Sequence, residues 1–133
     1  MKLTTRSEYA LLALICLARH KPGEYINGET IAQEQAIPQK FLQQILLTLK
    51  NARYVYSQKG QHGGYRLSKT PDTIMLAEIV RLFDGALAPT ESVSTYFYES
   101  TPVEKETKLI AVFKDIRDYV STKLENTTIA DVL

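Results

Sequence analysis

The chain of 133 residues contains one cysteine, two histidines and no tryptophan. Its single cysteine, Cys16, excludes an intramolecular disulfide framework and a metal cage built from several thiolates of one chain. The histidines, His20 and His62, lie far apart in the sequence, so no Ser/His/Asp arrangement can be inferred, and no other acid, base or nucleophile pair has an interpretable spacing. We therefore expect neither an enzyme nor a protein with a metal or other cofactor.

Long hydrophobic runs are also missing. The most apolar stretch, residues 9–18, is too short to span a bilayer, and no small-residue cleavage pattern follows it. It predicts a buried first helix, for which Thr5-Arg6-Ser7-Glu8 supplies a capping box. Cys16 lies within it, so we expect inert core packing rather than redox sensing, which needs access and a lowered thiol pKa. The sequence indicates a cytoplasmic protein with no membrane partner.

Charge divides the chain, although its net charge is only +1. Residues 1–70 contain ten Lys or Arg against four Asp or Glu, whereas residues 71–133 contain six against eleven. The first part is therefore basic and the second acidic, which suggests that only the first part faces a polyanion. Chance segregation of charge is the alternative.

The stretch from Ile37 to Leu67 begins with the pattern of an amphipathic helix. Its apolar residues recur at i, i+3, i+4 and i+7 and must be buried: Leu42, Ile45, Leu46 and Leu49. Its other face carries Lys40, Gln43, Gln44, Thr48 and Asn51. Gln and Asn can pair with the edge of adenine, and Lys can reach guanine or a phosphate. Taken alone, this face also fits the solvated surface of an ordinary helix.

After Arg53 the period changes to that of a β-hairpin. Tyr54–Gln58 is aromatic and β-branched, and Tyr65–Leu67 pairs with it across a glycine-rich tip. Glycines let such a tip approach a phosphate or a minor groove, with donors supplied by Lys59, His62 and Arg66. A nucleotide-binding phosphate loop is the competing interpretation, but that loop leads into a helix, and this one leads into a strand.

A short helix precedes this region. Asn27 is a good N-cap for a helix that ends near Ala36, and Pro38 suits the first turn of the next helix. A short helix, a tight turn and a polar-faced second helix form a helix-turn-helix, and the hairpin makes it winged. The predicted fold class is mainly α with a small β-hairpin wing (α+β), followed by a long helix.

The second half predicts two helices around an irregular segment. Asp72 begins a helix that ends near Asp84–Gly85, and the irregular residues 86–100 follow it. Thr101-Pro-Val-Glu104 combines a capping box with proline at the first helical position, so it predicts the start of a second, long helix. One apolar stripe continues along this helix: Leu109, Val112, Phe113, Ile116, Val120 and Leu124. A helix of about 30 Å exceeds what a small winged domain can cover, so we expect a homodimer. Folding back on its own domain as a monomer is the alternative.

These residues together resemble the BadM/Rrf2 family of winged-helix regulators. The resemblance covers nearly the whole chain and is carried by residues 1–10, 41–45, 59–67 and 128–133. It implies a homodimeric bacterial transcriptional repressor on a palindromic operator, with the recognition helix in the major groove and the wing in the minor groove. Carried over by position, the DNA-binding residues are Thr4, Thr5, Arg6, Tyr9, Gln39, Lys40, Phe41, Gln43, Gln44, Lys59, Gln61, His62 and Arg66.

Three features of the sequence depart from the family pattern. Lys59 stands where arginine is frequent, which predicts a weaker minor-groove contact, and Arg53 stands where many members have glycine after the recognition helix. Iron-sulfur members place three cysteines after the fourth helix, and residues 86–106 contain none, so we expect no cluster. The segment contains four carboxylates: Glu91, Glu99, Glu104 and Glu106. We expect them to be solvated surface side chains and not the ligands of a metal site.

The sequence thus favours a winged helix-turn-helix DNA-binding domain in residues 1–70, and a helical linker, sensor-like loop and dimerisation helix in residues 71–133. The alternative is a protein-interaction regulator that docks an enzyme or other partner through its acidic half, with Tyr96–Tyr98 as exposed rings. A signal would act at residues 84–101, because movement there would change the spacing of the two DNA-reading domains. Its nature stays open between a small molecule, a protein partner, oxidation and no signal at all.

Overall fold

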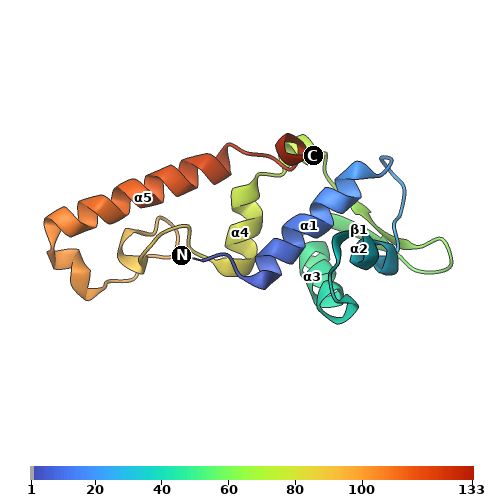
Figure 1. Ribbon diagram of the computed structural model, residues 1–133, viewed down its shortest axis with the longest axis horizontal. Helices are drawn as coiled ribbons and strands as arrows, with labels where there is room; N and C mark the ends of the chain where they lie inside the picture. Colours follow the sequence, from blue (N-terminus) through green and yellow to red (C-terminus); the bar gives the residue numbers. More distant parts are fainter. Residues whose placement is uncertain (1) are drawn as a thin grey trace.

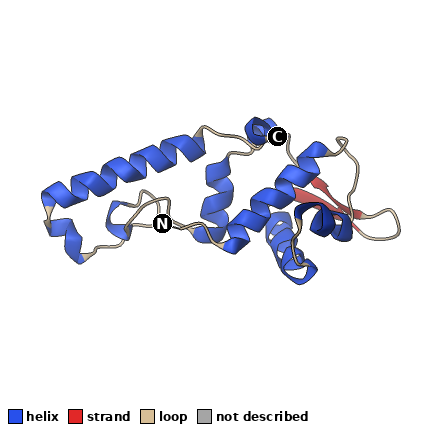
Figure 2. Cartoon of the chain, viewed as in Figure 1, coloured by secondary structure: helices blue, strands red, loops and turns tan. Residues whose placement is uncertain are grey.

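The computed structural model describes residues 2–133 and has two distinct ends (Figure 1). One end contains α1 (Thr5–Arg19), α2 (Gly28–Gln35), α3 (Gln39–Asn51) and the antiparallel hairpin of β1 (Val55–Gln58) and β2 (Gly64–Leu67). From there α4 (Leu76–Asp84) leads to the other end, which is formed by α5 (Thr107–Glu125) and the loops before it. Figure 2 shows helices throughout and strands only in the hairpin, so the predicted fold class is confirmed.

The first two helices have side-chain caps. Asn27 caps α2 as predicted, because its Oδ1 accepts the Thr30 N–H at 2.8 Å. The cap of α1 is Thr4, whose hydroxyl oxygen accepts the Ser7 N–H at 3.3 Å. The predicted cap at Thr5 was therefore wrong by one residue, since Thr5 already has helical geometry.

The turn between α2 and α3 is tight. Ala36 has the left-handed backbone, with φ of 53°, and Ile37 turns its side chain into the core at 3% exposure. Pro38 is the N-cap residue of α3, one position before the first turn in which it was expected. The fixed φ of proline still suits the helix entry, so α3 begins directly after the turn.

One core joins the helices of the hairpin end, which is the end that contains α1, α2, α3 and the hairpin. The predicted stripe of α3 is confirmed, since no member is more than 1% exposed: Leu42, Ile45, Leu46 and Leu49. The same core contains Ile74, Ile79 and Ile129 from the second half of the chain. Side chains from residues 1–70 and from residues 71–133 thus share this core. The predicted boundary between two domains at residue 70 therefore stays a prediction about charge and role.

The hairpin is held at its base by a third extended segment. β1 and β2 pair from Val55 opposite Leu67 to Gln58 opposite Gly64. Ile26 then forms two backbone hydrogen bonds with Tyr65, each of 2.8 Å. These bonds tie the wing to the loop that precedes α2, so the wing is anchored to the helix-turn-helix.

Arg53 adopts a left-handed conformation between α3 and β1, with φ of 67°. Left-handed geometry is unfavourable for residues with a Cβ and is the region where glycine fits best. This conformation gives a physical reason why glycine would suit this position, as the resemblance to the family implies.

The helix predicted from Asp72 begins later, at Leu76. A 3₁₀ turn occupies Pro71–Thr73, and Ile74 is extended because its carbonyl accepts the Ile129 N–H at 2.9 Å. The predicted end is correct, since Gly85 follows α4 with φ of 83°.

The predicted start of the long helix at Thr101 was also wrong. Residues Pro102–Lys105 form a separate 3₁₀ turn, and α5 begins at Thr107. The Thr101 hydroxyl donates to Ser92 Oγ at 2.8 Å, so it fastens the preceding loop and does not cap a helix. Within residues 2–133, no helix is both long and apolar enough to cross a membrane.

Gly64→Ala should destabilise the protein far more than Gly60→Ala. Gly64 has φ of 145°, and a Cβ there would lie 2.2 Å from the Ile26 carbonyl oxygen. Gly60 has φ of 105°, but nothing lies within 4 Å of its Cβ position. We expect a loss in free energy of unfolding of roughly 2–4 kcal/mol at Gly64 and about 1 kcal/mol at Gly60, measured by urea denaturation. Equal losses would show that the Ile26 contact does not constrain the wing.

Candidate nucleic-acid interface

The outer face of α3 is open to solvent and mostly polar, although Phe41 and Leu47 are also exposed on this helix. Opposite the buried stripe, every predicted contact residue on this helix is exposed: Gln39, Lys40, Phe41, Gln43 and Gln44. Pro38 supplies no side-chain cap, and the first turn of α3 contains no acidic residue. The N-terminus of the helix therefore keeps its partial positive charge, which favours a phosphate.

The start of α1 lies beside α3. Thr5, Arg6 and Tyr9 line one hollow of about 370 Å³ together with Phe41 and Gln44. The structure thus brings together two groups of residues that were predicted separately. The basic side chain of Arg6 and the uncapped N-terminus of α3 are suited to hold a nucleic-acid backbone.

Thr4 is engaged within the fold. Its N–H donates to Asp84 Oδ2 at 3.1 Å, and its hydroxyl donates to the other oxygen of the same carboxylate. Ser7 Oγ also donates to Asp84 Oδ2, at 2.7 Å. A carboxylate is favourable at a helix N-terminus, so Asp84 fixes the start of α1 against the end of α4. Thr4 lies at the predicted position, but its hydroxyl already has partners.

The wing separates the four residues predicted on it. Lys59, Gln61 and His62 are exposed around the turn between the strands. Arg66 lies on β2, where its guanidinium carbon is 5.0 Å from the ring centre of Tyr25 and 5.3 Å from that of Tyr56. The first three therefore form the exposed tip, and Arg66 stacks between two aromatic rings.

The predicted dimerisation stripe on α5 divides into two faces. Ile110 is buried at 8% exposure, and the half-buried Phe113, Val120 and Leu124 lie on the same side of the helix. Phe113 packs against the loop core around Val93, and Leu124 against a second core on α4. The remaining members of the stripe are exposed: Leu109, Val112 and Ile116. Tyr119, which the prediction omitted, extends this exposed row and is itself 76% exposed.

Comparisons with known proteins decide the family. Residues 3–133 match the model of a family named Rrf2 and described as an iron-dependent transcriptional regulator. This chain belongs to the Rrf2 family. The resemblance inferred from the sequence is thereby confirmed, and the class of function is transcriptional regulation by a DNA-binding protein.

Relatives of this Rrf2 protein include regulators with solved structures. CymR of Bacillus subtilis is 31% identical across 99% of this chain and 89% of its own. The structure of that protein, called the global cysteine regulator of B. subtilis, matches with a TM-score of 0.78 over 99% of this chain and 95% of CymR, at 32% identity. NsrR of B. subtilis is 38% identical over 61% of this chain and 56% of its own. The IscR structure from T. potens matches with a TM-score of 0.70 at 25% identity, covering 99% and 85% of the two chains.

The donor groups of this Rrf2 protein do not fit a thiolate-ligated iron-sulfur cluster. Such clusters rest on several cysteines, with only occasional replacement by histidine. The chain has a single cysteine, and it lies in α1, far along the sequence from the loop at residues 86–106.

Cys16 is buried in α1 at 1% exposure, as predicted. Its S–H donates to Glu34 Oε2 at 2.9 Å. Burial, together with the hydrogen bond and negative charge of Glu34, raises the pKa of the Cys16 thiol to about 12. The same hydrogen bond, with a second one from His20, lowers the pKa of Glu34. Sequence reasoning missed this cluster. The spacing of Cys16 and His20 by four residues, about one helical turn, is the signal that could have found it, although His20 is the C-cap residue of α1 and lies outside the helix.

Alkylation of Cys16 by iodoacetamide at pH 8 should be very slow in the folded, metal-free protein. A thiol pKa of about 12 leaves a thiolate population about 1,000-fold below that of a thiol at 9.0. Glu34→Gln removes the negative charge that raises this pKa, so it should accelerate alkylation, whereas Glu29→Gln on the same helix should not. Rapid modification of the folded wild-type protein, followed by mass spectrometry, would contradict this account.

Proposed function

We propose that this chain is a homodimeric, sequence-specific DNA-binding repressor that reads a palindromic operator. The observation that carries the proposal is the division of α3 into a fully buried apolar stripe and an exposed polar face. Because the stripe holds the helix in place, the polar face is directed outward whether or not a ligand is present. A helix presented in this way fits the width of the DNA major groove.

Each group of side chains has a distinct role in this proposal. Gln43 and Gln44 contact base edges, since a glutamine amide can both donate to and accept from adenine. Arg6 and the uncapped N-terminus of α3 hold the phosphate backbone, which sets the register without reading sequence. Lys59 enters the minor groove from the wing tip and supplies charge. Repression follows when the bound dimer covers a promoter.

The exposed row on α5 supports a second copy of the chain as the partner. At about 100° per residue, Leu109, Val112, Ile116 and Tyr119 fall within an arc of about 80°. Four large apolar side chains in one stripe form a contiguous patch of the kind that marks an interaction surface. A two-fold dimer buries the same patch on both copies and places two α3 helices on the two halves of a palindrome.

Gln43→Ala and Gln44→Ala should relax base preference, whereas Lys59→Ala should weaken binding to all sequences. Loss of a glutamine contact reduces discrimination at its base pair by about 1–3 kcal/mol. Loss of the lysine contact lowers the slope of log affinity against log salt by about 1. Titrations of selected and random duplexes by fluorescence anisotropy at several salt concentrations measure both effects. Lys108→Ala, which removes the same charge from α5, is the control and should leave both unchanged.

Ile116→Asp should shift the protein from dimer to monomer and weaken operator binding by at least about 10-fold. The substitution places a charge within the apolar row, where a partner would have to desolvate it. Ala111→Asp makes a similar change at an exposed position about 140° away around α5 and should leave the dimer intact. Analytical ultracentrifugation gives the mass of each variant. A wild-type protein that remains monomeric at high concentration would refute the dimer.

A further inference from the structure

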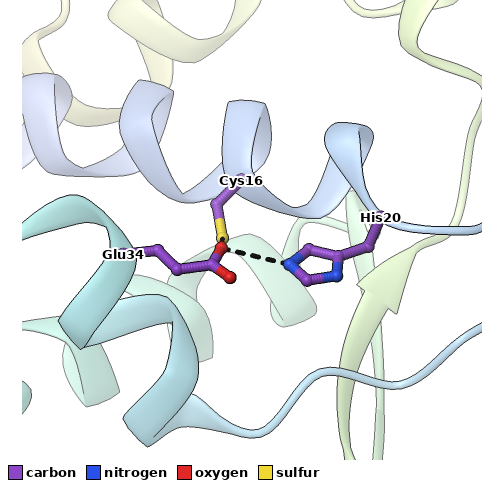
Figure 3. Close-up of side chains that lie close together, drawn as sticks. All are labelled: Cys16, His20 and Glu34. Atoms are coloured by element: carbon purple, nitrogen blue, oxygen red, sulfur yellow. Dashed lines mark hydrogen bonds and ion pairs between the residues drawn. The ribbon is translucent and has the colours of Figure 1, made fainter.

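Three side chains with different donor atoms converge between α1 and α2 (Figure 3). Cys16 lies in the last turn of α1, His20 is the extended C-cap residue of that helix, and Glu34 reaches both from the last turn of α2. Glu34 Oε2 is 2.9 Å from the Cys16 sulfur and 3.1 Å from His20 Nε2. The three donor atoms all lie within 4.8 Å of one another.

This spacing is close to that of a tetrahedral metal site. Zinc bonds of about 2.0–2.3 Å to nitrogen, oxygen and sulfur place the ligand atoms about 3.3–3.6 Å apart. Two of the three pairs already lie at or inside this separation, so a small rotation of exposed side chains would admit an ion. Cys16 comes from the last turn of α1 and His20 from the residue that ends it, and both side chains reach the same oxygen of Glu34.

We propose that Cys16, His20 and Glu34 form a binding site for one divalent transition-metal ion, with zinc as the best fit. Zinc accepts thiolate, imidazole and carboxylate ligands together, whereas magnesium and calcium prefer oxygen alone. Three protein ligands leave a fourth position for water. The site is distinct from the loop at residues 86–106, which lies toward the opposite end of the molecule (Figure 1).

Access and burial in this cluster suit a metal site. The sulfur is buried, so it is protected from solvent and from competing thiol chemistry. The side chains of His20 and Glu34 are 26% and 46% exposed, which leaves a path for an ion from solvent. The hydrogen bonds to Glu34 already orient the donors toward one point, which lowers the entropic cost of binding.

Binding requires the thiol to lose its proton. Without a metal, burial and Glu34 keep that proton in place by raising the thiol pKa. A divalent cation favours the thiolate instead, because it offsets the negative charge of Glu34 and binds the sulfur directly. Thiols that coordinate such an ion are deprotonated. The released proton goes to solvent, and no redox step takes place. The bound ion then cross-links the end of α1 to the end of α2.

Cobalt(II) and zinc(II) added separately to the purified, chelator-treated full chain test this site. We expect a thiolate-to-cobalt charge-transfer band in the near ultraviolet, and one zinc per chain by equilibrium dialysis with elemental analysis. Cys16→Ala should abolish the band. His20→Gln and Glu34→Gln should each weaken metal binding by at least about 10-fold. His62→Gln removes the other histidine, on the wing, and should bind metal like the wild type.

Thermal unfolding provides a readout that does not depend on the spectrum. Zinc at about 100 times its Kd should raise the Tm of the wild-type protein by about 5–10 °C, and should leave Tm of the Glu34→Gln variant almost unchanged. Circular dichroism checks the fold of each variant first. If Cys16→Ala does not fold, His20→Gln and Glu34→Gln still test the metal site. Both side chains are partly exposed, so we expect these two variants to fold. Absence of metal uptake by the wild type, or uptake retained in these variants, would overturn the proposal.

Discussion

The packing of α1 against the rest of the hairpin end is the interaction on which the structure depends. Helices α2, α3 and α4 and strand β2 all contact α1. Ala10 and Ala13 are fully buried, and their small side chains let neighbouring helices approach closely. Burial of the four apolar residues of α3 stabilises the fold by about 6–12 kcal/mol before entropy is subtracted, which is comparable to the whole net stability of a domain. Rotating α3 about its axis would expose these four residues and lose the stabilisation that their burial provides. The polar face of α3 is therefore held in one orientation.

Helix α1 also connects the hairpin end to the acidic half. Asp84, the last residue of α4, receives three hydrogen bonds from Thr4 and Ser7 at the start of α1. At its other end α4 is joined to the C-terminal segment, because the Leu76 N–H donates to the Thr127 carbonyl and Ile129 enters the main core. A displacement of α5 would therefore pass through α4 to the start of α1, beside the hollow that α1 shares with α3.

Much of this fold could be predicted from local sequence patterns. The stripe of α3, the cap at Asn27, the glycine after α4 and the period change at the wing each depend on residues close together in the chain, and each is present. The errors occurred where distant contacts decide the local structure. Thr101 has the pattern of a helix cap, but its hydroxyl donates to Ser92, and Ile74 is extended because it pairs with Ile129.

The candidate interface was less predictable than the fold for the same reason. Periodicity gave the exposed face of α3, but it could not show that Arg66 stacks on Tyr25, since that contact joins residues 41 positions apart. On α5, a single apolar stripe was expected where two faces are present, because amphipathicity alone does not tell a face that covers its own loops from one that is left exposed. The distinction depends on how much surface residues 86–106 cover. They bury Ile110 but leave Ile116 and Tyr119 in solvent, so the helix is longer than its own chain can shield.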